Sequence, residues 1–134
     1  MWIFRIRKER IAYYDAAELV ARVAKIESRL ERLGGTGGGI YEKYESLASK
    51  FSPVMKEKII ALGVARNSVV HGDPHIKEKE DVFALCDEIE SMIVERMNQD
   101  GISTMEGLGI FATFVSFVII GIIIYFIWEY MLKR

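Results

Sequence analysis

The sequence predicts an all-α protein: a four-helix bundle followed by one C-terminal transmembrane helix. Apolar residues recur at helical spacing through most of residues 11–98, and sustained alternation of the kind that strands need is missing. Residues 108–128 form one long apolar run. We therefore divide the chain into an arm (1–10), a helical bundle (11–98), a linker (99–107), a transmembrane helix (108–128) and a short tail (129–134).

The predicted transmembrane helix reads LGIFATFVSFVIIGIIIYFIW and carries no charged residue. About 20 apolar residues are needed to cross the hydrocarbon core of a bilayer as a helix. A fully buried core helix is the alternative, but a domain of roughly 100 residues could hardly enclose one. We expect a C-terminal membrane anchor.

The orientation of the anchor is predicted from the rest of the chain. The first residues lack the charged start, apolar run and cleavage site of a secretory signal. Basic residues lie at both ends of the chain, so the positive-inside rule favours neither orientation of the anchor. Cys86 is the single cysteine and cannot form an internal disulfide. A chain without disulfides is typical of a reducing compartment. We expect the N-terminal domain in the cytoplasm, at a bacterial inner membrane.

The arm, MWIFRIRKER, mixes large apolar and basic side chains. We expect it to lie in the membrane interface, with Trp2 and Phe4 entering the headgroup region and Arg5 and Arg7 meeting anionic lipid. A short extended segment over residues 2–7 is the alternative.

The first bundle helix is predicted from an apolar seam with alternating steps of four and three residues. The seam consists of Ala12, Ala16, Leu19, Val23, Ile26, Leu30 and Leu33. The sequence GGTGGG at residues 34–39 ends this helix and predicts a flexible loop. It is a poor phosphate-binding loop because Ile40 and Tyr41 stand where a lysine and a hydroxyl are needed.

Three further helices complete the predicted bundle. A short one carries Tyr41, Tyr44, Leu47, Ala48 and Phe51, and the next begins at Ser52-Pro53. That third helix runs to His71 and stops at Gly72. The fourth begins at about Ile76, and its predicted inner side comprises Val82, Phe83, Cys86, Ile89, Met92, Ile93 and Met97.

The end of the third helix carries the candidate catalytic residues Arg66, Asn67 and His71. Asn67 and His71 are four residues apart and share one helix face, with Arg66 beside it. Arginine pairs with phosphate oxygens, histidine exchanges a proton near neutral pH, and asparagine can orient either group. The alternative is an ordinary helix end, in which a histidine interacts with the helix dipole before a terminating glycine. His71, Asp73 and His75 make a poor ligand set, and we expect no metal and no cofactor.

The segment LGVARNSVVHG, on the third helix of a small bundle, resembles the signature of HEPN domains: an arginine, commonly a polar residue such as asparagine, and a histidine after four to six intervening residues. Arg66 and His71 fit with four between them, and the resemblance extends over about residues 11–98 in helix order. It implies metal-independent RNA cleavage at a site shared by two copies. Arg66 would bind phosphate, His71 would act as acid or base, and Asn67 would support it.

The same resemblance also implies non-enzymatic roles, because some HEPN proteins serve as binding or assembly modules. Many belong to toxin–antitoxin, abortive-infection and RNA-targeting CRISPR systems. The predicted transmembrane helix is a difference from the soluble HEPN nucleases and favours a role other than catalysis alone. Residues 1–105 carry 16 Lys/Arg and 17 Asp/Glu, so any RNA contact must be local.

Small residues in the anchor predict self-association. Gly109, Ala112, Thr113 and Ser116 share one helix face, and small residues let membrane helices approach closely. An anchor that merely tolerates small residues is the alternative. A head-to-tail interface that closes would give a ring, and a ring could enclose a pore.

Three functions follow as hypotheses. The first is a membrane-anchored effector of antiviral defence that cleaves RNA through an oligomeric Arg/His site. The second is a non-enzymatic oligomer that forms a membrane pore or depolarising complex as a CRISPR or defence accessory. The third is an inactive tail-anchored adaptor. The expected partners are a lipid membrane, further copies of the chain as a dimer or larger ring, RNA, and a protein of the defence system.

Overall fold

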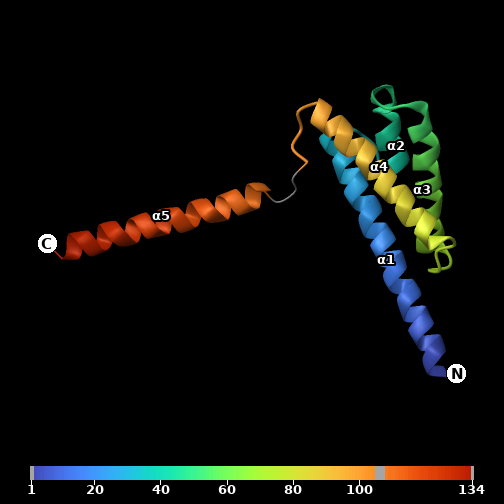
Figure 1. Cartoon of the computed structure of the whole chain (residues 1–134), viewed down its shortest axis with the longest axis horizontal. Coiled ribbons are helices and arrows are strands. Elements are labelled where there is room, and N and C mark those ends of the chain that lie inside the picture. Colours follow the sequence, from blue (N-terminus) through green and yellow to red (C-terminus); the bar gives the residue numbers. More distant parts are fainter. Residues whose placement is uncertain (1, 105–107, 134) are drawn as a thin grey trace. The chain divides into compact units, whose positions relative to one another are not determined.

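The computed structural model describes residues 2–104 and 108–133, and the side chains of residues 108–110 lie outside the description. In these ranges every regular element is a helix, which confirms the all-helical fold class. Two compact units, Met1–Ile102 and Ser103–Arg134, are described separately. The elements are α1 (Trp2–Arg32), α2 (Ile40–Glu45), the 3-10 turn η1 (Ala48–Lys50), α3 (Pro53–His71), α4 (Lys79–Gln99) and α5 (Leu108–Leu132) (Figure 1).

Helix α1 buries the seam that the sequence predicts. The buried members within the helix are Ala12, Ala16, Leu19, Val23, Ile26 and Leu30, and Leu33 is buried just beyond its end. Because these residues recur every three to four positions, they form one stripe that faces the other helices. Gly34 then adopts a positive φ of 96°, a conformation that ends the helix and that glycine adopts without steric cost.

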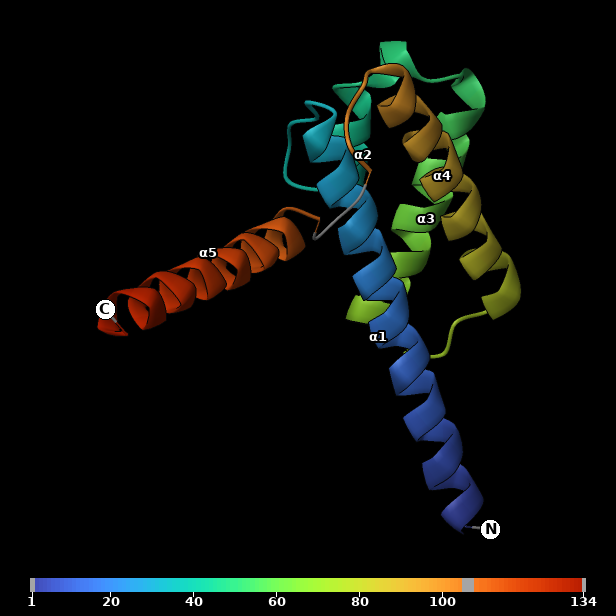
Figure 2. The same cartoon turned by 60° about the vertical axis from the view of Figure 1, so that its left-hand side comes forward.

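The predicted arm is the first part of α1 and has no helix boundary of its own. The helix runs without a break from Trp2, so the extended alternative for residues 2–7 is wrong. These first turns project beyond the other helices of their unit in both views (Figures 1 and 2). Trp2 and Phe4 are 76% and 74% exposed, because no bundle helix reaches that far along α1.

The glycine-rich connection has one buried residue and two hydrogen bonds from its backbone to side chains. Gly35 is buried, and the Thr36 amide donates a hydrogen bond of 2.9 Å to Ser46 Oγ. The Gly38 amide donates to Glu42 Oε2 at 2.7 Å. The glycines therefore serve a close approach of backbones and a set of side-chain contacts with α2.

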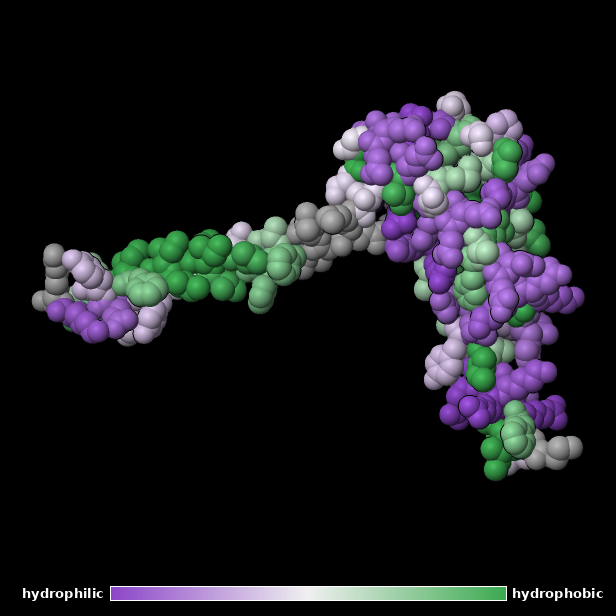
Figure 3. All heavy atoms as spheres, in the orientation of Figure 1, coloured by the Kyte–Doolittle hydropathy of each residue, from purple (hydrophilic) through white to green (hydrophobic). Residues whose placement is uncertain are grey.

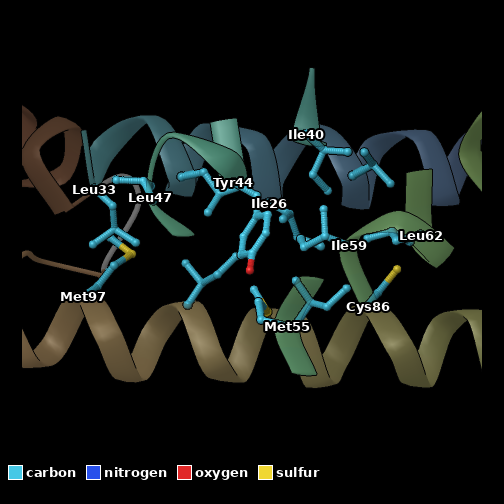
Figure 4. Packing of buried hydrophobic residues seen from close by; sticks show 14 of the residues in the cluster. Ile26, Leu33, Ile40, Tyr44, Leu47, Met55, Ile59, Leu62, Cys86 and Met97 are labelled. Carbon is cyan, nitrogen blue, oxygen red and sulfur yellow. The ribbon is translucent and has the colours of Figure 1, made fainter. Parts of the chain in front are cut away.

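The core lies between α1, α3 and α4, and the short α2 packs against α1 and α3. Figure 4 shows buried side chains of this core. Met55, Ile59 and Leu62 of α3 are fully buried. Helix α4 adds Cys86, Ile89, Ile93 and Met97 from its predicted inner side. Helix α4 begins three residues later than predicted, after Glu78, which has a positive φ of 52°.

One buried cation ties α2 to α1. The Lys43 ammonium lies 3.0 Å from Glu31 Oε1 and 3.3 Å from Glu27 Oε2, and the lysine side chain is 7% exposed. The hydrogen bond with Glu31, opposed by desolvation and aided by Glu27, raises the pKa of Lys43 above its ordinary value. Because both partners come from α1, this cluster fixes the position of the short helix.

Helix α5 is long and apolar enough to cross a membrane. Phe111–Leu132 spans 22 residues with a mean hydropathy of 2.5, and none of it is buried. Hydrophobic residues accordingly cover the middle of this helix in Figure 3, and hydrophilic ones lie near its C-terminal end. The helix extends past the predicted boundary at residue 128 into the predicted tail, where Lys133 Nζ pairs with Glu129 Oε1 at 2.7 Å.

Candidate functional site

Helix α3 presents two opposite stripes, and the candidate residues divide between them. The inner stripe, Met55, Ile59 and Leu62, is buried. The next position at the same spacing is Arg66, which is half-buried. The outer face of α3, a name used here for Ile60, Val64, Asn67 and His71, is exposed throughout.

The structure brings Arg66 and Asn67 into contact. Arg66 Nη1 donates a hydrogen bond of 3.1 Å to Asn67 Oδ1, so the guanidinium swings from the inner side of α3 toward the outer face. Since the Asn67 oxygen is occupied, its amide N–H groups are left as donors. His71 lies one turn beyond Asn67 on the same face, in the last turn of the helix. The three residues thus form one surface, which is open to solvent in a single copy of the chain.

Apolar side chains lie on the same outer face as the polar ones. Val64 is 65% exposed and Ile60 is 44% exposed, although both occur in the apolar part of the helix sequence. Together with Asn67 and His71 they follow steps of four, three and four residues. Exposed apolar groups arranged as a stripe are typical of a surface that another molecule covers.

A second arrangement, which the sequence does not reveal, lies beside this face. The last turns of α3, residues 73–77 and Val82 of α4 enclose a hollow of about 570 Å³, called the α3 groove below. Its polar lining consists of Ser68, Asp73, His75 and Lys77. Sequence reasoning considered Asp73 and His75 only as metal ligands. The Asp-Pro-His spacing is the one signal that could have indicated their pairing.

Asp73 and His75 form a tight pair at the edge of the α3 groove. Asp73 Oδ1 accepts from the His75 backbone amide at 2.9 Å and lies 2.6 Å from His75 Nδ1. These contacts, the backbone one first, lower the pKa of Asp73 below its ordinary value. The carboxylate holds the ring in one orientation, as such partners do in acid–base sites.

The remaining predicted site residues lie on α1 and α5. Ala112, Thr113 and Ser116 occupy consecutive turns of α5, and Ser116 Oγ donates to the Ala112 carbonyl at 2.8 Å. The surroundings of Gly109 lie outside the described residues. In the arm, Arg5 pairs with Glu9 at 3.4 Å, and Arg7 is exposed. Over residues 2–104 and 108–133, the structure gives no group of three or more His, Cys, Asp or Glu side chains that could hold a metal ion.

No protein-family model, curated protein or solved structure matches this chain. The resemblance to HEPN domains therefore rests on the motif and on the order of the helices.

Proposed function

We propose that the protein is a membrane-anchored, HEPN-like effector that cleaves RNA without a metal ion, through a site that two copies complete. The observation that carries this proposal is the exposed outer face of α3. It displays Asn67 and His71 beside Arg66, within a stripe of uncovered apolar side chains.

The three side chains supply the chemistry that RNA transesterification needs. A base removes the proton of the ribose 2′-hydroxyl, whose oxygen attacks the adjacent phosphorus. The P–O5′ bond breaks, and an acid protonates the departing 5′-oxygen, leaving a 2′,3′-cyclic phosphate. His71 serves as base or acid. Arg66 stabilises the charge on the phosphate, with Asn67 fixing the guanidinium by the 3.1 Å hydrogen bond.

A second copy of the chain would supply two things that a single copy lacks: a site closed to water and a second His71. On an open surface, water weakens the attraction between Arg66 and a phosphate. A second chain packed over Ile60 and Val64 would exclude that water and bring a second His71. Base and acid would then come from two copies of the same residue.

The proposal places the protein at a bacterial inner membrane, with α5 as the anchor. The N-terminal unit would lie in the cytoplasm, where RNA is present. A protein of the same antiviral defence system would trigger the activity.

The test is an RNA cleavage assay with the full chain in detergent and EDTA present. The His71→Ala variant is expected to lose activity about 100- to 10,000-fold, the usual contribution of an acid or base. Asn98→Ala, at an exposed position on α4 outside the site, is the control variant and should keep full activity. RNA turnover that persists in His71→Ala, or that is never seen in the intact oligomer, would contradict the proposal.

The small-residue face of α5 favours a second candidate, a non-enzymatic oligomer that opens a membrane pore. Ala112 and Ser116 leave space for close helix contacts, and Ser116 already satisfies its hydroxyl within its own helix. Dye leakage from liposomes that contain the protein, unchanged by His71→Ala, would support this candidate over the nuclease. Intact liposomes and uncleaved RNA together would leave a tail-anchored adaptor.

A further inference from the structure

The α3 groove has the size and lining of a small-ligand site. Its volume of about 570 Å³ lies within the usual range for ligand pockets, roughly 300–1,000 Å³. One wall is aliphatic, with Ala61, Ala65 and Val69 from α3. Ser68 and Lys77 add polar groups to the same hollow. Such a combination positions a molecule that has both an apolar face and an anionic group.

The Asp73 contact determines which hydrogen-bonding role His75 offers. An ionised carboxylate can only accept hydrogen bonds, so at 2.6 Å His75 Nδ1 carries the proton and donates a hydrogen bond to Asp73 Oδ1. In the neutral ring the other nitrogen, Nε2, then has a free lone pair. Nε2 is therefore an acceptor, and its natural partner is a hydroxyl group of the ligand.

The open form of the groove favours a flat polar-edged group over an acyl chain. Ala61 and His75 in its lining are both exposed, so a hydrocarbon chain placed there would keep much of its surface in water. A nucleobase can lay one face on aliphatic side chains while its edges stay hydrated. The groove also adjoins the candidate catalytic surface, because Val64 belongs to both and Ser68 follows Asn67 directly.

We propose that the α3 groove is a ribonucleotide subsite. The base packs on the aliphatic wall, the 2′-hydroxyl donates a hydrogen bond to His75 Nε2, and Lys77 contacts a phosphate. This assignment rests on the proposed action on RNA, and it adds the location of a bound nucleotide and the basis for preferring RNA over DNA. The 2′-hydroxyl is the group by which a protein distinguishes the two.

The experiment measures binding in the full-length His71→Ala protein, which keeps the RNA probe intact. The probes are a fluorescein-labelled RNA octanucleotide and the DNA of the same sequence. One lost hydrogen bond corresponds to about a 5-fold change in affinity, so RNA should bind about 5-fold more tightly than DNA. Adding His75→Ala should remove this preference and leave DNA binding unchanged.

Two further variants and one control distinguish binding in the groove from binding at other basic surfaces. Ala61→Phe, at an exposed position in the aliphatic wall, should fill the groove and weaken RNA binding without disturbing the core. Lys77→Ala should weaken RNA and DNA alike, and Lys56→Ala, an exposed lysine elsewhere on α3, should weaken neither.

The possible failures of the two proposals can be told apart. Equal affinity for RNA and DNA, or a preference that survives His75→Ala, would overturn the subsite while leaving the nuclease proposal in place. RNA binding that is lost in an Arg5→Ala/Arg7→Ala variant and retained in Ala61→Phe would also overturn the subsite, because the RNA would then bind at the arm. If wild-type protein neither binds nor cleaves the RNA, the subsite and the proposed function both fail.

Discussion

A charge placed on the outer face of α3 tests whether a second copy of the chain covers this face. If a second copy covers this face, Val64→Glu should separate the copies while leaving each one folded. Val64 is 65% exposed in a single copy, so the exchange removes little packing there and should change stability by less than about 0.5 kcal/mol.

The expected effect on association follows from the exposed fraction. Full burial of a valine side chain stabilises by about 1.5–3 kcal/mol, so covering the 65% that is exposed contributes about 1–2 kcal/mol per copy. In a symmetric pair both copies contribute, which gives about 2–4 kcal/mol. The dissociation constant should therefore rise roughly 30- to 700-fold, since 1.4 kcal/mol is a factor of ten.

The assay is light scattering during size-exclusion chromatography of the detergent-solubilised chain at a series of protein concentrations. Ala24→Glu, at an exposed position on α1, introduces the same charge away from the proposed interface and is the matched control. If wild type, Val64→Glu and Ala24→Glu dissociate over the same concentration range, the outer face of α3 is not an interface between copies. The composite site would then lose its structural basis.

Three further predictions concern the bundle itself. A Cβ on Gly35 would lie 2.8 Å from the Leu30 carbonyl oxygen, so Gly35→Ala should cost about 1–3 kcal/mol by denaturant unfolding, whereas Gly38→Ala, with only ordinary contacts, should cost nothing. Burial raises the pKa of the Cys86 thiol to about 11, so iodoacetamide should react with it at pH 8 at least 100-fold more slowly in folded than in unfolded protein. The ion pairs that raise the pKa of Lys43 stabilise the fold below the ordinary lysine pKa of about 10.4. That contribution should disappear as pH rises above this value, and pH-dependent melting should show the loss in wild type and not in Lys43→Met. Rapid Cys86 alkylation, a neutral Gly35→Ala, or identical alkaline melting of the two proteins would each contradict the corresponding packing argument.

The helical core could be predicted because its signal is local. The seam from Ala12 to Leu30 repeats at helical spacing, and burial follows from that spacing once other helices cover one side. The same reasoning is less informative for α3. Its apolar residues lie on both sides of the helix, so periodicity alone does not tell the buried Ile59 from the exposed Ile60 and Val64.

Two features depend on contacts between distant residues and could not be predicted from local pattern. The composition of the glycine run does not indicate that Gly35 lies close to the backbones of Leu30 and Lys43. The candidate site also depends on contacts that local sequence pattern does not reveal. Spacing placed Asn67 and His71 on one face, but it is the fold that leaves this face uncovered and closes residues 73–77 into a groove.

A membrane anchor changes how strong the interface between copies must be. Two chains held in one bilayer diffuse in two dimensions at a fixed height, which raises their effective concentration in the way that a tether does. An interface formed by few side chains, such as Ile60 and Val64 with their polar neighbours, would therefore form at lower protein levels in a membrane than in free solution. Nuclease activity that depends on such a pair would then rise with the density of the protein in the membrane. This dependence gives a physical reason for joining α5 to a bundle whose candidate catalytic residues lie exposed in a single copy.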